Sequence, residues 1–126
     1  RWCEKEDVSD GDWWPVETDW RDHRNTKFVD AICGAEIQTA EPRSLAERWA
    51  EVLQVSMEML DGVPTIPTMD GPVRFTEPSD QRPEGLGAID VRVRDPQMVA
   101  DRAASFGLRC HDRTIEISGL RFHLVG

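Results

Sequence analysis

Eight polar side chains alternate with apolar residues in the strand-like segments of this sequence: Glu36, Gln38, Arg74, Thr76, Asp90, Arg92, Arg121 and His123. Successive residues of a strand point to opposite faces, so these polar side chains are predicted to share one face. Arginine can bind a carboxylate or phosphate through two hydrogen bonds. A carboxylate whose pKa is raised by burial could act as a general base. The pattern predicts a polar pocket for an anionic or carbonyl-bearing small molecule.

The same charges could instead neutralise one another. Glu36 would then pair with Arg74, and Asp90 with Arg121, as structural or solvated ion pairs of small individual value. Both interpretations stay open from the residues alone.

The elements that must position these side chains begin at residue 28. Residues 28–39 have the pattern of a strand, and Glu41 followed by Pro42 is a favoured helix opening. Four apolar residues at helical spacing then predict the buried stripe of a helix: Leu45, Trp49, Val52 and Leu53. Strands are expected at 55–60, 63–69 and 72–77, separated by the turn dipeptides at 61–62 and 70–71.

The same order recurs after residue 85. Residues 86–93 predict a strand, and Asp95 with Pro96 opens a helix whose end is marked by Gly107. The buried stripe of this helix is expected to hold Val99, Ala103 and Phe106. Strands at 108–112, 114–118 and 120–125 complete a second β-α-β-β-β unit.

An internal repeat relates the two units. Residues 36–48 match residues 90–102 at a shift of 54, which places Pro42 on Pro96 and Glu36 on Asp90. Residues 73–75 match 120–122 at a shift of 47, so the second unit is shorter. The repeat predicts two modules, at about 28–78 and about 85–126, in one domain spanning 28–126.

Two tandem βαβββ modules resemble the vicinal-oxygen-chelate superfamily, which includes glyoxalase I, extradiol dioxygenases and fosfomycin- and bleomycin-resistance proteins. The stretches that carry the resemblance are residues 35–53, 86–108 and 119–125, and they are most similar to uncharacterised bacterial glyoxalase-like proteins. The resemblance implies an α+β fold in which the modules form a cupped mixed sheet around a central cavity, with helices on the outer face.

Metal sites of that superfamily use His, Gln or Glu early in the first strand of a module and a Glu on its last strand. The corresponding first-strand positions here hold Gly34 and Ala88, which offer no side-chain ligand. We therefore expect no cofactor and no metal site of the family type. A register slip of two would make Glu36 and Asp90 ligands beside His123, so a divalent metal at an atypical site stays as the alternative.

Composition limits the partners. The chain of 126 residues carries 15 Lys and Arg against 24 Asp and Glu, a net charge of −9, which disfavours nucleic acid and anionic membranes. No apolar run approaches the ~20 residues that span a bilayer. Cys3, Cys33 and Cys110 are an odd and widely spaced set, neither a disulfide framework nor a zinc motif, so a cytoplasmic location is expected. Cys110 is predicted to be a buried structural residue, with His111 on the opposite face.

Residues 1–27 differ from the rest, with Trp2, Trp13, Trp14 and Trp20 among many charges and turn residues. They predict either an arm that packs its indoles on the domain or an interdomain linker. Since the chain begins at Arg1, preceding modules of a longer protein are one expectation, and a homodimer is another.

Three functions follow from these features. The first is a glyoxalase-like domain that binds a small organic ligand without the family metal. The second is a metal-dependent lyase, isomerase or dioxygenase of the same superfamily. The third is a non-catalytic structural half of a longer multi-module protein.

Overall fold

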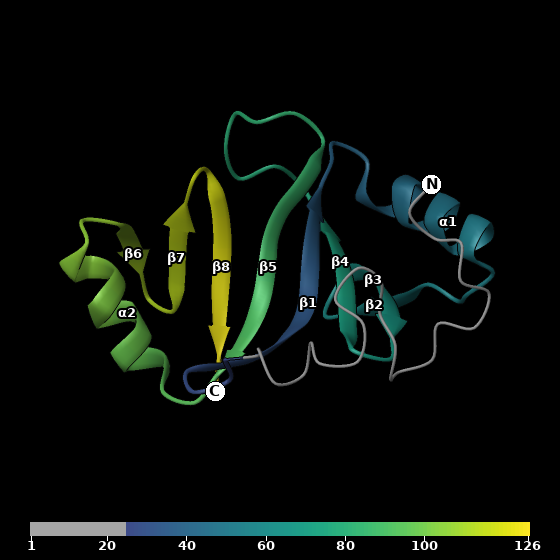
Figure 1. Cartoon of the computed structure of the whole chain (residues 1–126). Coiled ribbons are helices and arrows are strands. Elements are labelled where there is room, and N and C mark those ends of the chain that lie inside the picture. The colour runs from purple at the N-terminus through teal and green to yellow at the C-terminus, as the bar shows by residue number, and fades with distance from the viewer. Residues whose placement is uncertain (1–24) are drawn as a thin grey trace, which may run out of the picture.

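The computed structural model describes residues 25–126, which form two units of the same element order (Figure 1). Most of the predicted Trp-rich arm, residues 1–24, lies outside the described residues. The first unit comprises β1 (Val29–Gln38), α1 (Pro42–Leu53), β2 (Glu58–Leu60), β3 (Val63–Thr68) and β4 (Gly71–Thr76). The second comprises β5 (Gly85–Val93), α2 (Pro96–Ser105), β6 (Arg109–His111), β7 (Thr114–Ile117) and β8 (Leu120–Val125). The predicted β-α-β-β-β order is therefore confirmed for both units.

All eight of these strands belong to one mixed sheet, in the order β2-β3-β4-β1-β5-β8-β7-β6. β1 is parallel to β4 and β5 is parallel to β8, while β1 and β5 meet in antiparallel fashion at the centre. The two units are thus joined edge to edge along β1 and β5, with one helix at each end of the sheet (Figure 1). This arrangement confirms the predicted α+β fold with a cupped sheet.

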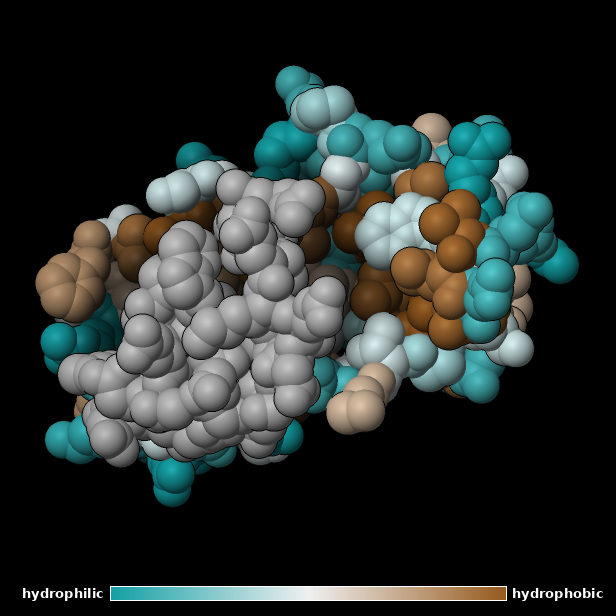
Figure 2. Space-filling model, turned by 45° about the vertical axis from the view of Figure 1, so that its right-hand side comes forward, coloured by the Kyte–Doolittle hydropathy of each residue, from teal (hydrophilic) through white to brown (hydrophobic). Residues whose placement is uncertain are grey.

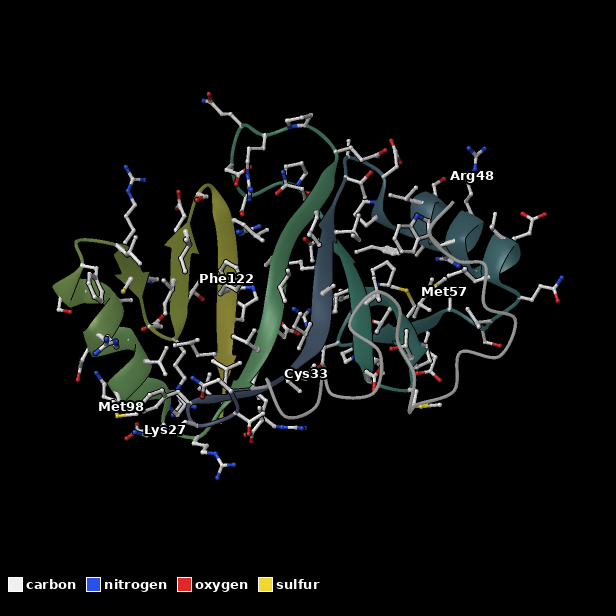
Figure 3. The ribbon with its side chains drawn as sticks, viewed as in Figure 1. Lys27, Cys33, Arg48, Met57, Met98 and Phe122 are labelled. Atoms are coloured by element: carbon white, nitrogen blue, oxygen red, sulfur yellow. The ribbon has the colours of Figure 1, made fainter. Side chains whose placement is uncertain are left out.

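Both helices pack on the same face of the sheet. Ala35 of β1 and Ile89 of β5 are register partners and therefore share a face, and each belongs to the apolar set that was predicted to lie under the helices. One apolar cluster lies under α1 and contains Ile37, Ala46, Ile66 and Phe75, with Trp49 and Met57 packed against it. The other lies under α2 and contains Val91, Val93, Ala100, Ala103, Ile115 and Leu124, with Phe122 packed against it. Met57 and Phe122 mark these two separate cores in Figure 3. The polar face of the sheet is consequently the one without helices.

The two helix openings differ in detail. Asp95 caps α2, since its Oδ1 accepts a hydrogen bond from the Met98 amide at 3.1 Å. Glu41 occupies the equivalent position before α1 but makes no side-chain cap, and its amide instead donates to Thr39 Oγ1 at 3.2 Å. Asp95 therefore satisfies one of the free amides at the start of its helix, while Glu41 does not.

The buried stripes of the helices are shorter than predicted. Val52 is 75% exposed and Phe106 is 70% exposed, and Leu53 is also exposed. α1 packs on β3 and β4 and runs away from the sheet toward its C-terminal end (Figure 1), so its last turn has no strand to cover. Phe106 follows the last residue of α2 and lies under the Arg102 guanidinium, whose Cζ is 5.5 Å from the ring centroid. Periodicity predicted these three side chains as buried because it carries no information about where the supporting sheet ends.

The side of the molecule that holds α1 and β2 to β4 carries hydrophobic surface (Figure 2). The exposed large apolar residues between the start of α1 and the end of β4 are Val52, Leu53, Val55, Met59, Leu60 and Met69. Within residues 25–126, no helix is both long and apolar enough to cross a membrane.

Candidate functional site

The central strands β1 and β5 place charged side chains on the polar face, each opposite a small residue. Glu36 is the register partner of Ala88, and Asp90 is the partner of Gly34. A Cβ built on Gly34 would collide with the Asp90 carboxylate, so that carboxylate lies directly over the glycine. The small residues at 34 and 88 thus leave room for the carboxylates of the opposite module to lie flat across the seam.

Asp90 uses that room to bind Arg74 of the other module. Arg74 donates from both terminal nitrogens, Nη1 to Oδ2 at 2.5 Å and Nη2 to Oδ1 at 2.8 Å. Asp90 is 5% exposed, and donating these hydrogen bonds to its carboxylate raises the pKa of Arg74. A two-pronged pair of this kind is both directional and strong relative to a surface ion pair.

Glu36 makes the second pair, also across the seam. Arg121 Nη2 donates to Glu36 Oε2 at 3.2 Å, whereas the nearest nitrogen of Arg74 is 3.9 Å from Glu36 Oε1. His123 completes this side, with Nε2 3.7 Å from Glu36 Oε1 and Nδ1 2.9 Å from Thr114 Oγ1. Two acids and two arginines therefore form one network with no net charge at the centre of the polar face: Glu36, Asp90, Arg74 and Arg121.

This pairing corrects the one expected from the repeat. Sequence reasoning paired Glu36 with Arg74 and Asp90 with Arg121, each inside its own module, but the short pairs are Asp90–Arg74 and Glu36–Arg121. The strand order alone places Glu36 of β1 beside Arg74 of β4, in its own unit. The pairs cross because the Asp90 carboxylate lies over Gly34 of β1 and there meets Arg74 of β4. The network is consequently a connection between modules.

The donors of Arg121 are largely used within the protein. Besides Glu36, its guanidinium donates from Nε to the Gly87 carbonyl at 3.3 Å and from Nη1 to Ser79 Oγ. Nη2 also lies 3.5 Å from Gln38 Oε1. Arg121 is thus fixed as a structural group, with only part of its surface facing the polar side.

The three remaining predicted pocket residues lie outside the charged centre, although Gln38 reaches it through its contact with Arg121. Gln38 is 1% exposed and donates to the segment that joins the modules, including the Pro83 carbonyl at 3.1 Å. Thr76 accepts the Thr39 amide through its backbone oxygen at 2.8 Å. Arg92 is exposed and lies 4.0 Å from an oxygen of Asp30. Five of the eight candidates are therefore brought together: Glu36, Arg74, Asp90, Arg121 and His123. Gln38 is a buried neighbour of this group. Within residues 25–126, Thr76 and Arg92 make no side-chain hydrogen bond or ion pair with it.

The donor set at the centre does not fit a divalent cation. Among residues 25–126, no three His, Cys, Asp or Glu side chains form a group able to hold a metal ion. Glu36 and His123 are neighbours, but the Asp90 carboxylate is occupied by Arg74. A cation placed there would also meet the guanidinium groups of Arg74 and Arg121.

An open hollow of about 590 Å³ lies beside the network, over the three outer strands of the second module. It is lined by Arg109, Cys110 and His111 of β6, Thr114 and Glu116 of β7, and Arg121 and His123 of β8. Register aligns these strands so that Glu116 lies between Arg109 on one side and Arg121 on the other. The hollow thus has a charged floor at the end of the polar face.

Arg109, His111 and Glu116 were not among the residues predicted to line a pocket. The signal for them was present, because alternation in the segments 109–111 and 114–117 places them on the same face as Arg121 and His123.

Cys110 was expected to be buried, and this is wrong. The residue is exposed because β6 is the outermost strand of the sheet on this side. Its sulfur lies 3.6 Å from the Ala100 carbonyl of α2, on the helix side. His111 is itself exposed and lies 3.4 Å from Asp112, so Cys110 and His111 do not form a thiolate–imidazole pair.

No protein-family model and no curated protein matches this sequence. Solved structures do resemble it. Methylmalonyl-CoA epimerase from Mycobacterium tuberculosis superposes with a TM-score of 0.57 at 18% identity, over 80% of this chain and 90% of that one. A xylose isomerase-like TIM barrel/4-hydroxyphenylpyruvate dioxygenase fusion protein gives 0.63 at 17% identity, over 80% of this chain but 20% of that one. A hypothetical protein from Bacillus halodurans C-125 gives 0.56 at 10% identity, over 75% and 91%.

These likenesses concern the fold. With the paired modules and the central β1–β5 seam, they confirm the fold that the resemblance to the vicinal-oxygen-chelate superfamily implied.

Proposed function

We propose that this vicinal-oxygen-chelate domain binds a small organic anion, without a metal, in the hollow over β6, β7 and β8. The observation that carries the proposal is the lining of that hollow, which gathers Arg109, His111, Arg121 and His123 around a single acid, Glu116. In a chain of net charge −9, this local excess of basic side chains runs against the overall charge. Such a site favours an anionic ligand, whereas the acidic remainder of the surface favours cations.

Arg109 is the group best placed to hold the anion. Arg74 donates its hydrogen bonds to Asp90, and Arg121 donates to Glu36 and the backbone. Arg109 is exposed, and within residues 25–126 it makes no ion pair or side-chain hydrogen bond. Its planar guanidinium is therefore available to a carboxylate or phosphate in the two-pronged geometry that arginine favours.

The neutral network supports this role by fixing the wall of the hollow. Arg121 is held by Glu36 of the central seam, and His123 is held by Thr114, which itself lines the hollow. A ligand that enters the hollow meets side chains whose positions are already set, which lowers the entropic cost of binding.

Binding is tested on the full chain by thermal shift and by NMR titration with small carboxylates and phosphate esters. We expect at least one such anion to stabilise the protein and to shift the amide signals of β6 to β8. Arg109→Ala should weaken that ligand at least about tenfold, as expected for loss of a charged hydrogen bond. Arg113→Ala, which removes the same charge from an exposed position of the β6–β7 turn outside the hollow, should leave the affinity unchanged. Equal effects of the two variants would refute binding in the hollow.

A metal-dependent reaction is the competing proposal, and it draws on the structural neighbours, among which are epimerases and a dioxygenase fusion. Metal analysis of the purified protein separates the two. A stoichiometric divalent ion that Glu36→Ala abolishes would overturn metal-free binding. If instead no small molecule bound, the third function, a structural half of a longer protein, would replace both.

A further inference from the structure

The floor of the hollow also contains an acid that the binding of a simple anion does not use. Glu116 is half-buried and is the register partner of Arg109 on β6 and of Arg121 on β8. Within residues 25–126, neither arginine forms an ion pair with it, because Arg121 is turned to Glu36 and Ser79. A carboxylate between two arginines thus keeps its oxygens available in a site whose other charged groups are basic.

The two charges differ in depth. Arg109 is exposed and has a long side chain, whereas Glu116 is shorter and half-buried, so its carboxylate lies nearer the sheet. Residues paired across antiparallel strands have Cα atoms about 4.5 to 5.5 Å apart, so both charges lie within reach of one small molecule. The hollow therefore offers a cation at its rim and an anion at its floor.

Resting on the proposed function, we infer that the ligand is a small zwitterion, an amino carboxylate whose carboxylate binds Arg109 and whose ammonium group binds Glu116. A monoanionic carboxylate matches the one guanidinium that is available, while a doubly charged phosphate would meet the repulsion of Glu116. A half-buried carboxylate is more stable beside a cation than alone. The ammonium group therefore offsets the loss of Glu116 hydration that occurs when the ligand displaces water.

Three matched compounds test the inference: phenylalanine, 3-phenylpropionate, which lacks the amino group, and phenethylamine, which lacks the carboxylate. Affinities are measured by NMR titration of the full chain, with the signals of β6 to β8 reporting on the hollow. We expect phenylalanine to bind at least about tenfold more tightly than either partial analogue, since each analogue leaves one charged group of the site without its partner.

Two variants separate this inference from the proposed function. Glu116→Gln, of nearly the same shape, should lower the affinity for phenylalanine to that of 3-phenylpropionate and leave 3-phenylpropionate no weaker. Arg109→Ala should weaken both acids. If 3-phenylpropionate binds as tightly as phenylalanine, or if Glu116→Gln leaves their ratio unchanged, the zwitterion inference is refuted while anion binding stands. If none of the three compounds shifts the signals of β6 to β8, both proposals fail for this ligand class.

Discussion

Replacing Asp90 with asparagine tests whether the Arg74–Asp90 pair holds the two modules together. The side chain of Asp90 is 8% exposed and that of Arg74 is 27% exposed, so the pair lies between the buried and the surface extremes. Breaking a fully buried pair costs about 3–5 kcal/mol, and a surface pair contributes about 1 kcal/mol or less. Arg74 keeps some hydration and has Glu36 at 3.9 Å as a second partner. We therefore expect Asp90→Asn to lower the free energy of unfolding by about 2 kcal/mol.

The chain supplies a matched control for this substitution. Asp30 also lies on a seam strand and pairs with Arg94 at 3.3 Å, but the side chains are 31% and 64% exposed. Asp30→Asn removes the same charge and should change the free energy of unfolding by about 0.5 kcal/mol or less.

Urea denaturation of the full chain, read at two independent probes, gives both values. A double-mutant cycle of Asp90→Asn with Arg74→Met should return a coupling energy of about 1–2 kcal/mol. If Asp90→Asn matched Asp30→Asn, or if the cycle gave no coupling, the pair would be an incidental contact and the cross-module account would fail.

Two further outcomes follow from the contacts. In the same urea assay, Asp95→Ala should lower the free energy of unfolding by about 1 kcal/mol, because Asp95 caps its helix. Glu41→Ala, at the equivalent position, should lower it by only a few tenths of a kcal/mol, because Glu41 makes no side-chain cap. Equal effects of the two substitutions would contradict this difference. Hydrogen bonding from the Arg82 amide lowers the pKa of Asp80 from its ordinary 3.8. Folding therefore favours the charged carboxylate, and its contribution to the free energy of unfolding is complete above pH 3.8. That stabilisation is lost as the pH falls through the lowered pKa. An NMR titration of the Asp80 carboxyl carbon should therefore give a midpoint below pH 3.8. A midpoint at or above pH 3.8 would show that the contact is absent in solution.

Local chemistry made the elements of this fold predictable from the sequence. Asp61 and Gly62 adopt positive φ angles of 52° and 79°, which suit the tight hairpin turn predicted there. Ser118 and Gly119, at 53° and 80°, form the matching turn between β7 and β8. Gly107, at φ 77°, ends the second helix as expected. These features depend on a few neighbouring residues, so a single sequence is enough to place them.

Burial at the margins was predicted less well, because it depends on distant elements. Trp49 packs edge-on against Phe75, with ring centroids 5.1 Å apart, while Val52, one turn further along the helix, is exposed. Both fit the same apolar stripe in the sequence. Only the extent of the sheet distinguishes them, and that extent is set by strands about 10 to 25 residues away along the chain.

The pairing of the central charges shows the same limit at the site itself. The repeat relates Glu36 to Asp90 and Arg74 to Arg121, but it says nothing about which carboxylate meets which guanidinium across the seam. That choice depends on the antiparallel β1–β5 register, which includes irregular steps that no periodicity announces. Because the pairs cross between modules, both central arginines are used in holding the seam together. A ligand anion must then find its cation elsewhere on the polar face, and in the hollow over the outer strands that cation is Arg109.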